Sequence, residues 1–226
     1  MIKINKPASV PLNTFLNLLY SIRIPFFIFL ISRIVIILAG AYSLPVFLGF
    51  KYEAYQNIFI SMFSKWDAGA YMDIATKGYS YNPLAQSNVV WFPLYPYLGK
   101  ILNIFIQNIN ISLLLLSNTC FLLALITLFN ITKNRFGEDT ALRTCLYISI
   151  FPTAFFYSCA YTESLFLLTL VAAFYFAEKN NWLLVGVIGL LSSMTRMVGI
   201  GLFFAMGLYY LELNQWDIRK TKINIA

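Results

Sequence analysis

The fold is decided by residues 25–48, which read PFFIFLISRIVIILAGAYSLPVFL. This run holds a single charged side chain, Arg33. It is long enough to cross the hydrocarbon core of a bilayer, which takes about 20 helical residues. The whole chain shares this character, because 60% of its 226 residues are hydrophobic and only 11% are charged. A soluble domain carries about a quarter charged residues, so we expect lipid to be the solvent of this chain.

Five further apolar runs follow, most of them separated by short polar turns. Together with the first run they predict an all-α, polytopic membrane helix bundle of about six transmembrane helices. We expect residues 1–226 to form a single membrane domain without internal repeats. The expected spans after the first are residues 111–131, 141–160 (with Pro152 in its later half), 163–177, 182–194 and 197–211.

Residues 49–110 differ from the rest of the chain, because charges, Asn, Pro, Trp and Tyr all appear there. The pattern predicts short interfacial helices at residues 53–63, 67–77 and 98–109. Asp67 suits the N-cap of the second helix, and Gly78 suits its end. Pro93 and Pro96 stand three residues apart and predict no regular helix through that stretch.

The distribution of Lys and Arg predicts the orientation. If the N-terminus is cytoplasmic, ten of the 16 basic residues lie inside and four lie in the 49–110 region. The positive-inside rule then makes 49–110 the first external loop. Arg33 is expected to extend toward the cytoplasmic headgroups. The net charge of +7 forms no basic stripe, so we expect no nucleic acid partner.

Composition also limits the chemistry. The chain has no histidine, which excludes histidine acid–base catalysis, histidine metal sites and a Ser-His-Asp triad. Its three cysteines lie in apolar stretches without a CxxC pair, and we expect them to be inert. Any reaction must use Asp, Glu, Arg, Lys, Tyr or a metal ion held by oxygen atoms.

Asp67 is the first candidate site residue. It stands beside Trp66 at the start of an interfacial helix, and Tyr71 lies one turn further along the same helix face. A carboxylate in this setting suits a general base for a hydroxyl acceptor, although the residues alone favour a plain helix cap beside an interfacial Trp. Asp73 falls on another face and is expected to be solvated or structural.

Glu163 and Arg196 are expected on the same external side as Asp67. Glu163 follows Tyr161 at the tight turn before a predicted span, where a helix-start acid is also favourable. Arg196 interrupts an apolar run and needs a partner, either a phosphate or Glu163 itself. We predict Asp67 as catalytic. The predicted substrate-binding residues are Trp66, Tyr71, Tyr161, Glu163 and Arg196.

No cofactor is established by this pattern. Asp67 and Glu163 have the oxygen donors that a divalent metal ion prefers, but two carboxylates do not decide whether a metal is bound. An arginine beside a carboxylate and aromatic rings suits a phosphorylated lipid donor and a polar acceptor.

At these residues the chain resembles the membrane mannosyltransferases related to the enzyme that adds the second mannose of GPI anchors, including their bacterial relatives. Order and spacing agree over about residues 33–211. The stretches that carry the resemblance are Trp66-Asp67-Ala68 with Ile74-Ala75 and Gly78-Tyr79, then Phe92-Pro93-Leu94-Tyr95-Pro96, then Phe151-Pro152-Thr153-Ala154-Phe155-Phe156 with Tyr161-Thr162-Glu163-Ser164-Leu165-Phe166, and Thr195-Arg196.

This resemblance implies a GT-C fold with a large first external loop. It also implies an inverting transfer of a sugar, expected to be mannose, from a polyprenyl-phosphate donor such as dolichyl phosphate mannose to a glycan or glycolipid acceptor. The catalytic base of the family then corresponds to Asp67. Members usually have more helices, so we expect this chain to be the N-terminal part of a longer bundle. Met197 departs from the family pattern, in which proline follows Thr195-Arg196.

Two alternatives stay open at this stage. A transporter or flippase for lipid-linked glycans would explain a helix broken at Thr195-Arg196. A non-catalytic membrane scaffold would explain the same bundle without any use for Asp67. The expected location is a bacterial plasma membrane or the endoplasmic reticulum membrane.

Overall fold

The structure is a computed structural model, and it describes residues 12–48, 58–84 and 87–216. These residues form α-helices and two short 3-10 helices, and no strand occurs among them. The elements are α1 (Leu12–Leu48), α2 (Ile58–Phe63), α3 (Ala68–Lys77), α4 (Leu94–Ile106), α5 (Ile109–Phe136), α6 (Glu138–Ile150), η2 (Pro152–Tyr157), α7 (Glu163–Glu178), α8 (Trp182–Ser193), η3 (Met197–Gly199) and α9 (Ile200–Leu213).

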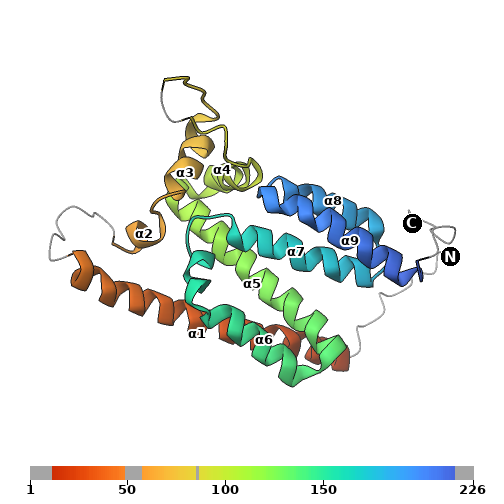
Figure 1. The fold of residues 1–226 in the computed structure, drawn as a ribbon. Helices are drawn as coiled ribbons and strands as arrows, with labels where there is room; N and C mark the ends of the chain where they lie inside the picture. The colour runs from red at the N-terminus through yellow and green to blue at the C-terminus, as the bar shows by residue number, and fades with distance from the viewer. Residues whose placement is uncertain (1–11, 49–57, 85–86, 217–226) are drawn as a thin grey trace, which may run out of the picture.

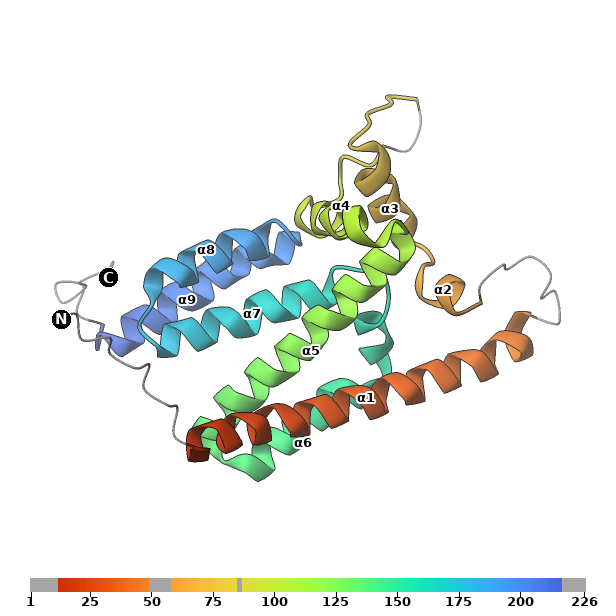
Figure 2. The same ribbon diagram turned by 180° about the vertical axis from the view of Figure 1, so that it is seen from behind.

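Helix α5 is the central element of the bundle (Figure 1). It packs against α1 and α6 on one side and against α7 on the other, and α8 and α9 form a layer over α7. Helices α3 and α4 lie at the end where α5 begins, which we call the α3–α4 end (Figure 2). The loops after α6 and after α8 return to that same end. The fold therefore gathers segments from four parts of the chain at one place.

Helix ends follow from local chemistry. Asn108 and Asn181 cap α5 and α8, each accepting a hydrogen bond of 3.2 Å from the backbone N–H three residues further on. Gly78 ends α3 and Gly137 ends α5, with φ of 86° and 87°, values that residues with a side chain rarely adopt. The predicted end of α3 at Gly78 is confirmed.

Two predicted boundaries were wrong. The apolar run at residues 25–48 is the later part of a helix that already begins at Leu12. The predicted span 141–160 ends at Ile150, because Pro152 cannot continue an α-helix, and the chain turns into the 3-10 helix η2.

The short helices predicted within residues 49–110 are found in part. Residues 58–63 and 68–77 are helical, while residues 53–57 lie outside the described part of the chain. Helix α4 begins at Leu94 rather than at the expected residue 98, which corrects the interpretation of the two prolines. Pro93 is the N-cap and Pro96 stands in the first turn, where a missing N–H breaks no helical hydrogen bond.

Arg33 does not extend to the headgroups as predicted. It is 6% exposed, and its Nη1 donates a 2.6 Å hydrogen bond to the hydroxyl of Ser158. Its guanidinium lies 4.6 Å from the ring centroid of Phe121 and 5.7 Å from that of Phe29. Hydrogen bonding and cation–π contact hold this cation inside the bundle, between α1, α5 and the end of η2.

Among the described residues, two helical segments are long and apolar enough to cross a membrane, Ser21–Ser43 within α1 and Ile109–Phe136. The remaining apolar helices of the described chain are shorter than 18 residues. The three cysteines are free and buried, as expected.

Candidate functional site

A pocket of about 260 Å³ opens at the α3–α4 end of the bundle. Three candidate residues from distant parts of the chain line it together, Asp67, Glu163 and Arg196. The other lining residues are Tyr71, Val90, Trp91, Phe92, Tyr161, Thr162, Thr195, Met197 and Val198. The predicted external cluster is therefore one site in space.

Asp67 stands at the N-cap of α3, but its carboxylate does not act as a cap. Its backbone is helical, at φ −58° and ψ −24°, and its side chain makes no capping hydrogen bond. In the described chain no ion pair involves this carboxylate. Asp67 therefore lines the pocket without a salt-bridge partner among the described residues.

The turn before α3 is fixed to the loop before α7. The hydroxyl of Tyr161 donates a 3.1 Å hydrogen bond to the carbonyl of Lys65. Next to this bond, the N–H of Ala160 donates a 2.9 Å hydrogen bond to the carbonyl of Phe63. These contacts hold Asp67 opposite the start of α7, where Glu163 lies.

Glu163 and Arg196 form an ion pair across the pocket, with 2.7 Å between Oε1 and Nη1. The pair predicted as one alternative for these residues is confirmed. The Arg196 side chain is 39% exposed, so the pair is open to solvent on the pocket side. Arginine carries five N–H donors, and one contact to Glu163 leaves others available to an anion.

The position of Arg196 follows from a break between α8 and α9. The N–H of Leu94 donates a 3.0 Å hydrogen bond to the carbonyl of Met194, which attaches the break to the start of α4. Thr195 is 1% exposed, and its hydroxyl donates to the carbonyl of Ser192. Arg196 itself is extended, at φ −154° and ψ 150°, and its side chain enters the pocket.

Tyr71 and Trp91 form the aromatic wall of the pocket. Their ring centroids lie 5.3 Å apart in an edge-to-face arrangement, and Tyr95 packs behind Tyr71 at 5.2 Å. Burial raises the pKa of Tyr71 to about 12, with a smaller opposing effect from its hydrogen bond with Thr162. The phenol of Tyr71 therefore stays protonated at neutral pH and acts as a hydrogen-bonding group rather than as a base.

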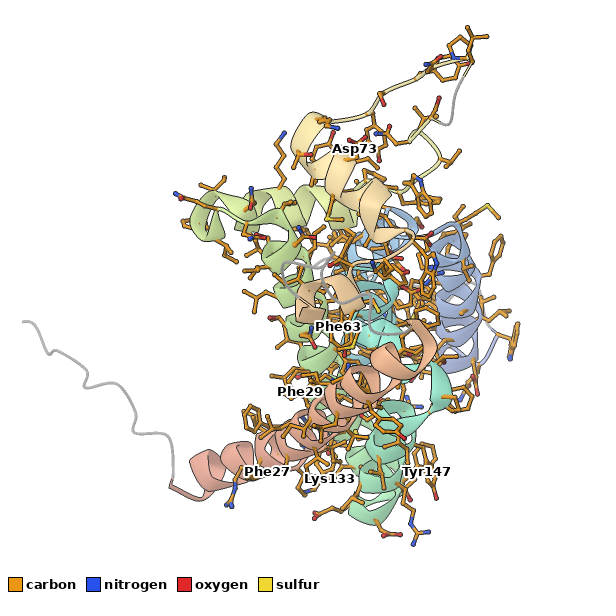
Figure 3. All side chains as sticks on the ribbon, turned by 90° about the vertical axis from the view of Figure 1, so that its left-hand side faces the viewer. Phe27, Phe29, Phe63, Asp73, Lys133 and Tyr147 are labelled. Carbon is orange, nitrogen blue, oxygen red and sulfur yellow. The ribbon has the colours of Figure 1, made fainter. Side chains whose placement is uncertain are left out.

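Asn88 organises the loop that carries Trp91. Its side-chain amide donates to the carbonyl of Gly78 at 3.1 Å and to the carboxylate of Asp73 at 3.2 Å, and its Oδ1 accepts from the N–H of Ser80 at 2.8 Å. Asp73 also pairs with Lys77 at 2.8 Å, which confirms the structural role expected for it. Figure 3 shows Asp73 at this end of the molecule and Lys133 at the opposite end.

Trp66 is placed apart from the other predicted site residues. It is 79% exposed, has a left-handed backbone with φ 48°, and does not line the pocket. Its predicted contact with substrate stays a prediction. Sequence reasoning missed Trp91, Phe92 and Thr162 as pocket residues, although Phe92 and Thr162 lie in stretches that carried the family resemblance and Trp91 adjoins one of them.

The structure brings no metal-binding cluster together within residues 12–48, 58–84 and 87–216. No three His, Cys, Asp or Glu side chains gather there in a way that would hold an ion. Asp67 and Glu163 alone thus leave the question of a bound divalent metal open, as they did in the sequence.

A comparison with known protein families finds a match over residues 91–226. They match the family described as dolichyl-phosphate-mannose-protein mannosyltransferase. The chain belongs to this family. Comparisons with curated proteins and with solved structures found no significant match.

This mannosyltransferase family uses polyprenyl-phosphate mannose as its donor and has the GT-C type of fold. The resemblance noted from the sequence is therefore confirmed at the level of the GT-C mannosyltransferases. The match includes Trp91, Glu163 and Arg196 but not Asp67 or Tyr71. The pocket unites residues from inside and outside the matched region.

Proposed function

We propose that this mannosyltransferase-family chain transfers mannose, with inversion, from a polyprenyl phosphate to a hydroxyl acceptor in the pocket at the α3–α4 end. The observation that carries the proposal is the pairing of groups there: a carboxylate without an ion-pair partner, Asp67, and an arginine held by Glu163 in the same pocket. A glycan or glycolipid is the acceptor class that the sequence resemblance favours.

The arrangement supplies what an inverting transfer needs. The acceptor oxygen attacks the anomeric carbon while the bond from that carbon to the phosphate oxygen breaks, and the acceptor proton passes to a carboxylate. Asp67 is assigned as this base, because the carboxylate of Glu163 is already paired with Arg196. Arg196 stabilises the negative charge that develops on the departing lipid phosphate. Glu163 positions Arg196.

The aromatic wall suits the sugar. Tyr71 and Trp91 offer apolar ring surface beside the polar pair, and the neutral phenol of Tyr71 adds a hydrogen-bonding group. In the proposed topology about six segments cross the membrane, the N-terminus is cytoplasmic and the α3–α4 end lies on the non-cytoplasmic side. The excess of Lys and Arg outside residues 49–110 supports this orientation.

The test is transfer from radiolabelled polyprenyl-phosphate mannose in membranes that contain the chain. Asp67→Asn keeps the shape of the side chain and removes the base, so turnover should fall about 100-fold or more at unchanged protein level. Asp73→Asn is the matched control, since Asp73 lies on the same helix and outside the pocket, and it should stay within about 2-fold. If Asp67→Asn retains most of the transfer rate, the assignment of the base is wrong.

A further inference from the structure

Tyr161 lies in the loop before α7, between the central helix α5 and the turn that carries Asp67. The sequence predicted it as a substrate-binding residue. It borders the pocket, but it is only 5% exposed. Its ring stacks on that of Phe156, with the centroids 5.7 Å apart. The pocket therefore offers little of this side chain to a substrate.

The hydroxyl of Tyr161 holds the turn that leads into α3. It donates its 3.1 Å hydrogen bond to the carbonyl of Lys65, and the same carbonyl accepts a 3.2 Å bond from the N–H of Ala68. Two donors from different elements thus meet at one carbonyl, two residues before Asp67. Because Tyr161 and Lys65 are 96 positions apart, this bond attaches the turn to a distant part of the chain.

The turn itself has an unfavourable backbone conformation. Trp66 lies at φ 48°, which bulky residues rarely adopt and which persists only where the surrounding contacts enforce it. The carbonyl of Trp66 accepts a 3.1 Å bond from the N–H of Gly69, within the first turn of α3. The direction of the Asp67 side chain is therefore set at Trp66, between the bond from Tyr161 and the start of α3.

The backbone of Tyr161 is anchored to α5. Its carbonyl accepts a 3.2 Å hydrogen bond from the hydroxyl of Ser117, which lies 2.7 Å from the hydroxyl of Tyr95. Ser117 and Tyr95 are both 0% exposed. Hydrogen bonds that are shielded from water hold their partners firmly. A buried chain of hydrogen bonds thus runs from α5 through Tyr161 to the turn before α3.

We infer that Tyr161 is a positioning residue: its hydroxyl holds the carboxylate of Asp67 where it can take the proton of the acceptor. The role of Asp67 as base rests on the proposed function, whereas the fixing of the turn rests on the hydrogen bonds alone. Glu163 follows two residues later in the first turn of α7, so the same segment also places the partner of Arg196. Loss of the hydroxyl should therefore lower turnover rather than substrate binding.

Hydrogen–deuterium exchange of the folded protein in detergent tests the positioning without requiring sugar transfer. Tyr161→Phe removes the hydroxyl and keeps the ring. The amides of residues 68–71 bond to the carbonyls of residues 65–67. They should exchange about 5-fold faster in the variant, the effect of losing one hydrogen bond. Tyr209→Phe is the matched control, because it removes a phenol that bonds to Arg135 at the opposite end of α5 and should leave these amides unchanged.

Steady-state kinetics of the same preparations test the consequence. With polyprenyl-phosphate mannose, kcat of Tyr161→Phe should fall about 10-fold per folded molecule while KM stays within about 2-fold. In an Asp67→Asn background, Tyr161→Phe should add almost nothing, since there is no base left to position. Tyr209→Phe should stay within about 2-fold of the parent in both constants.

Unchanged exchange at residues 68–71 in Tyr161→Phe, or faster exchange with unchanged kcat, would overturn the inference. A raised KM with unchanged kcat would also overturn it and assign Tyr161 to substrate binding. Ser117→Ala replaces Tyr161→Phe if that variant does not fold, because it removes the bond to the carbonyl of Tyr161, and it should speed the same amides by a smaller factor. Faster exchange in a chain that transfers no mannose keeps Tyr161 as the residue that fixes the turn and rejects the proposed function, and mannose transfer with unchanged exchange does the reverse.

Discussion

In the α1–α5–α6 part of the bundle an arginine is enclosed among neutral side chains, whereas at the α3–α4 end an arginine lines an open pocket beside a carboxylate. Arg33 is 6% exposed and contacts Ser158 and the ring of Phe121. Arg196 is 39% exposed and pairs with Glu163. Both interrupt apolar sequence, so the same residue type has two physical roles in one chain.

The difference shows what separates a structural cation from one available to a ligand. Arg33 is 6% exposed, and its hydrogen bonds and ring contacts are all made to neutral side chains of the described chain. Arg196 has one partner within the ion pair and solvent on its other side. Replacing either arginine with glutamine removes its charge. We expect the change at Arg196 to lower mainly turnover, and the change at Arg33 to lower mainly stability.

The largest effect is expected at Arg196. Arg196→Gln removes the charge that stabilises the leaving phosphate, so turnover of polyprenyl-phosphate mannose should fall about 100-fold. The melting temperature in detergent should change little, because the pair is partly exposed. Kinetics and thermal unfolding of one preparation check both statements. A large loss of stability with normal turnover would make Arg196 a structural residue like Arg33.

Glu163→Gln should reduce turnover about 10-fold, less than the loss at Arg196, because the arginine remains but is no longer held in place. The pair is best examined with a double-mutant cycle. Once Arg196 is glutamine, Glu163→Gln should add almost nothing, since a positioning residue has nothing left to position. Independent, additive losses would show that Glu163 acts on the substrate directly.

Arg33→Gln should show the opposite profile. It removes a charged hydrogen bond and two ring contacts from the core, which should cost about 2 kcal/mol or about 4–8 °C in melting temperature. Turnover per folded molecule should stay within about 2-fold, because Arg33 does not line the pocket. If turnover of folded Arg33→Gln falls as far as that of Arg196→Gln, Arg33 is not a purely structural residue and the contrast between the two arginines is wrong.

The sequence predicted most of the helices and the composition of the site. Apolar runs located α5, α7 and α8, and Gly78 was recognised as the end of α3. Asp67, Glu163 and Arg196 were expected on one side because the turns between helices alternate between the two ends of a bundle. That argument needs only the order of helices and turns along the chain, which can be read from the sequence without knowing any contact between distant residues.

What the sequence missed depends on contacts between distant residues. The environment of Arg33 is set by Ser158, 125 positions away, and no feature near Arg33 indicates it. The position of Trp91 depends on Asn88 reaching back to Asp73 and Gly78. The turn before α3 depends on a hydrogen bond that spans 96 positions. Such geometry is a property of packing, and residue spacing along one segment does not contain it.

The exposed pair Asp73–Lys77 gives the smallest expected effect and a reference for Glu163–Arg196. Lys77, followed by Asn88, holds the pKa of Asp73 below its usual value of 3.8. A lowered folded pKa contributes stability above the unfolded pKa, and this is lost as the pH falls through the folded value. The stabilising difference between the parent and Asp73→Asn should therefore be present at about pH 6 and shrink below about pH 4. Melting curves of the two proteins across that range measure it. Because both side chains are exposed, the difference should be slight.

A difference that persists unchanged at low pH would mean that Asp73 stabilises the loop through shape rather than charge, and the pair would then be no reference for the ion pair in the pocket.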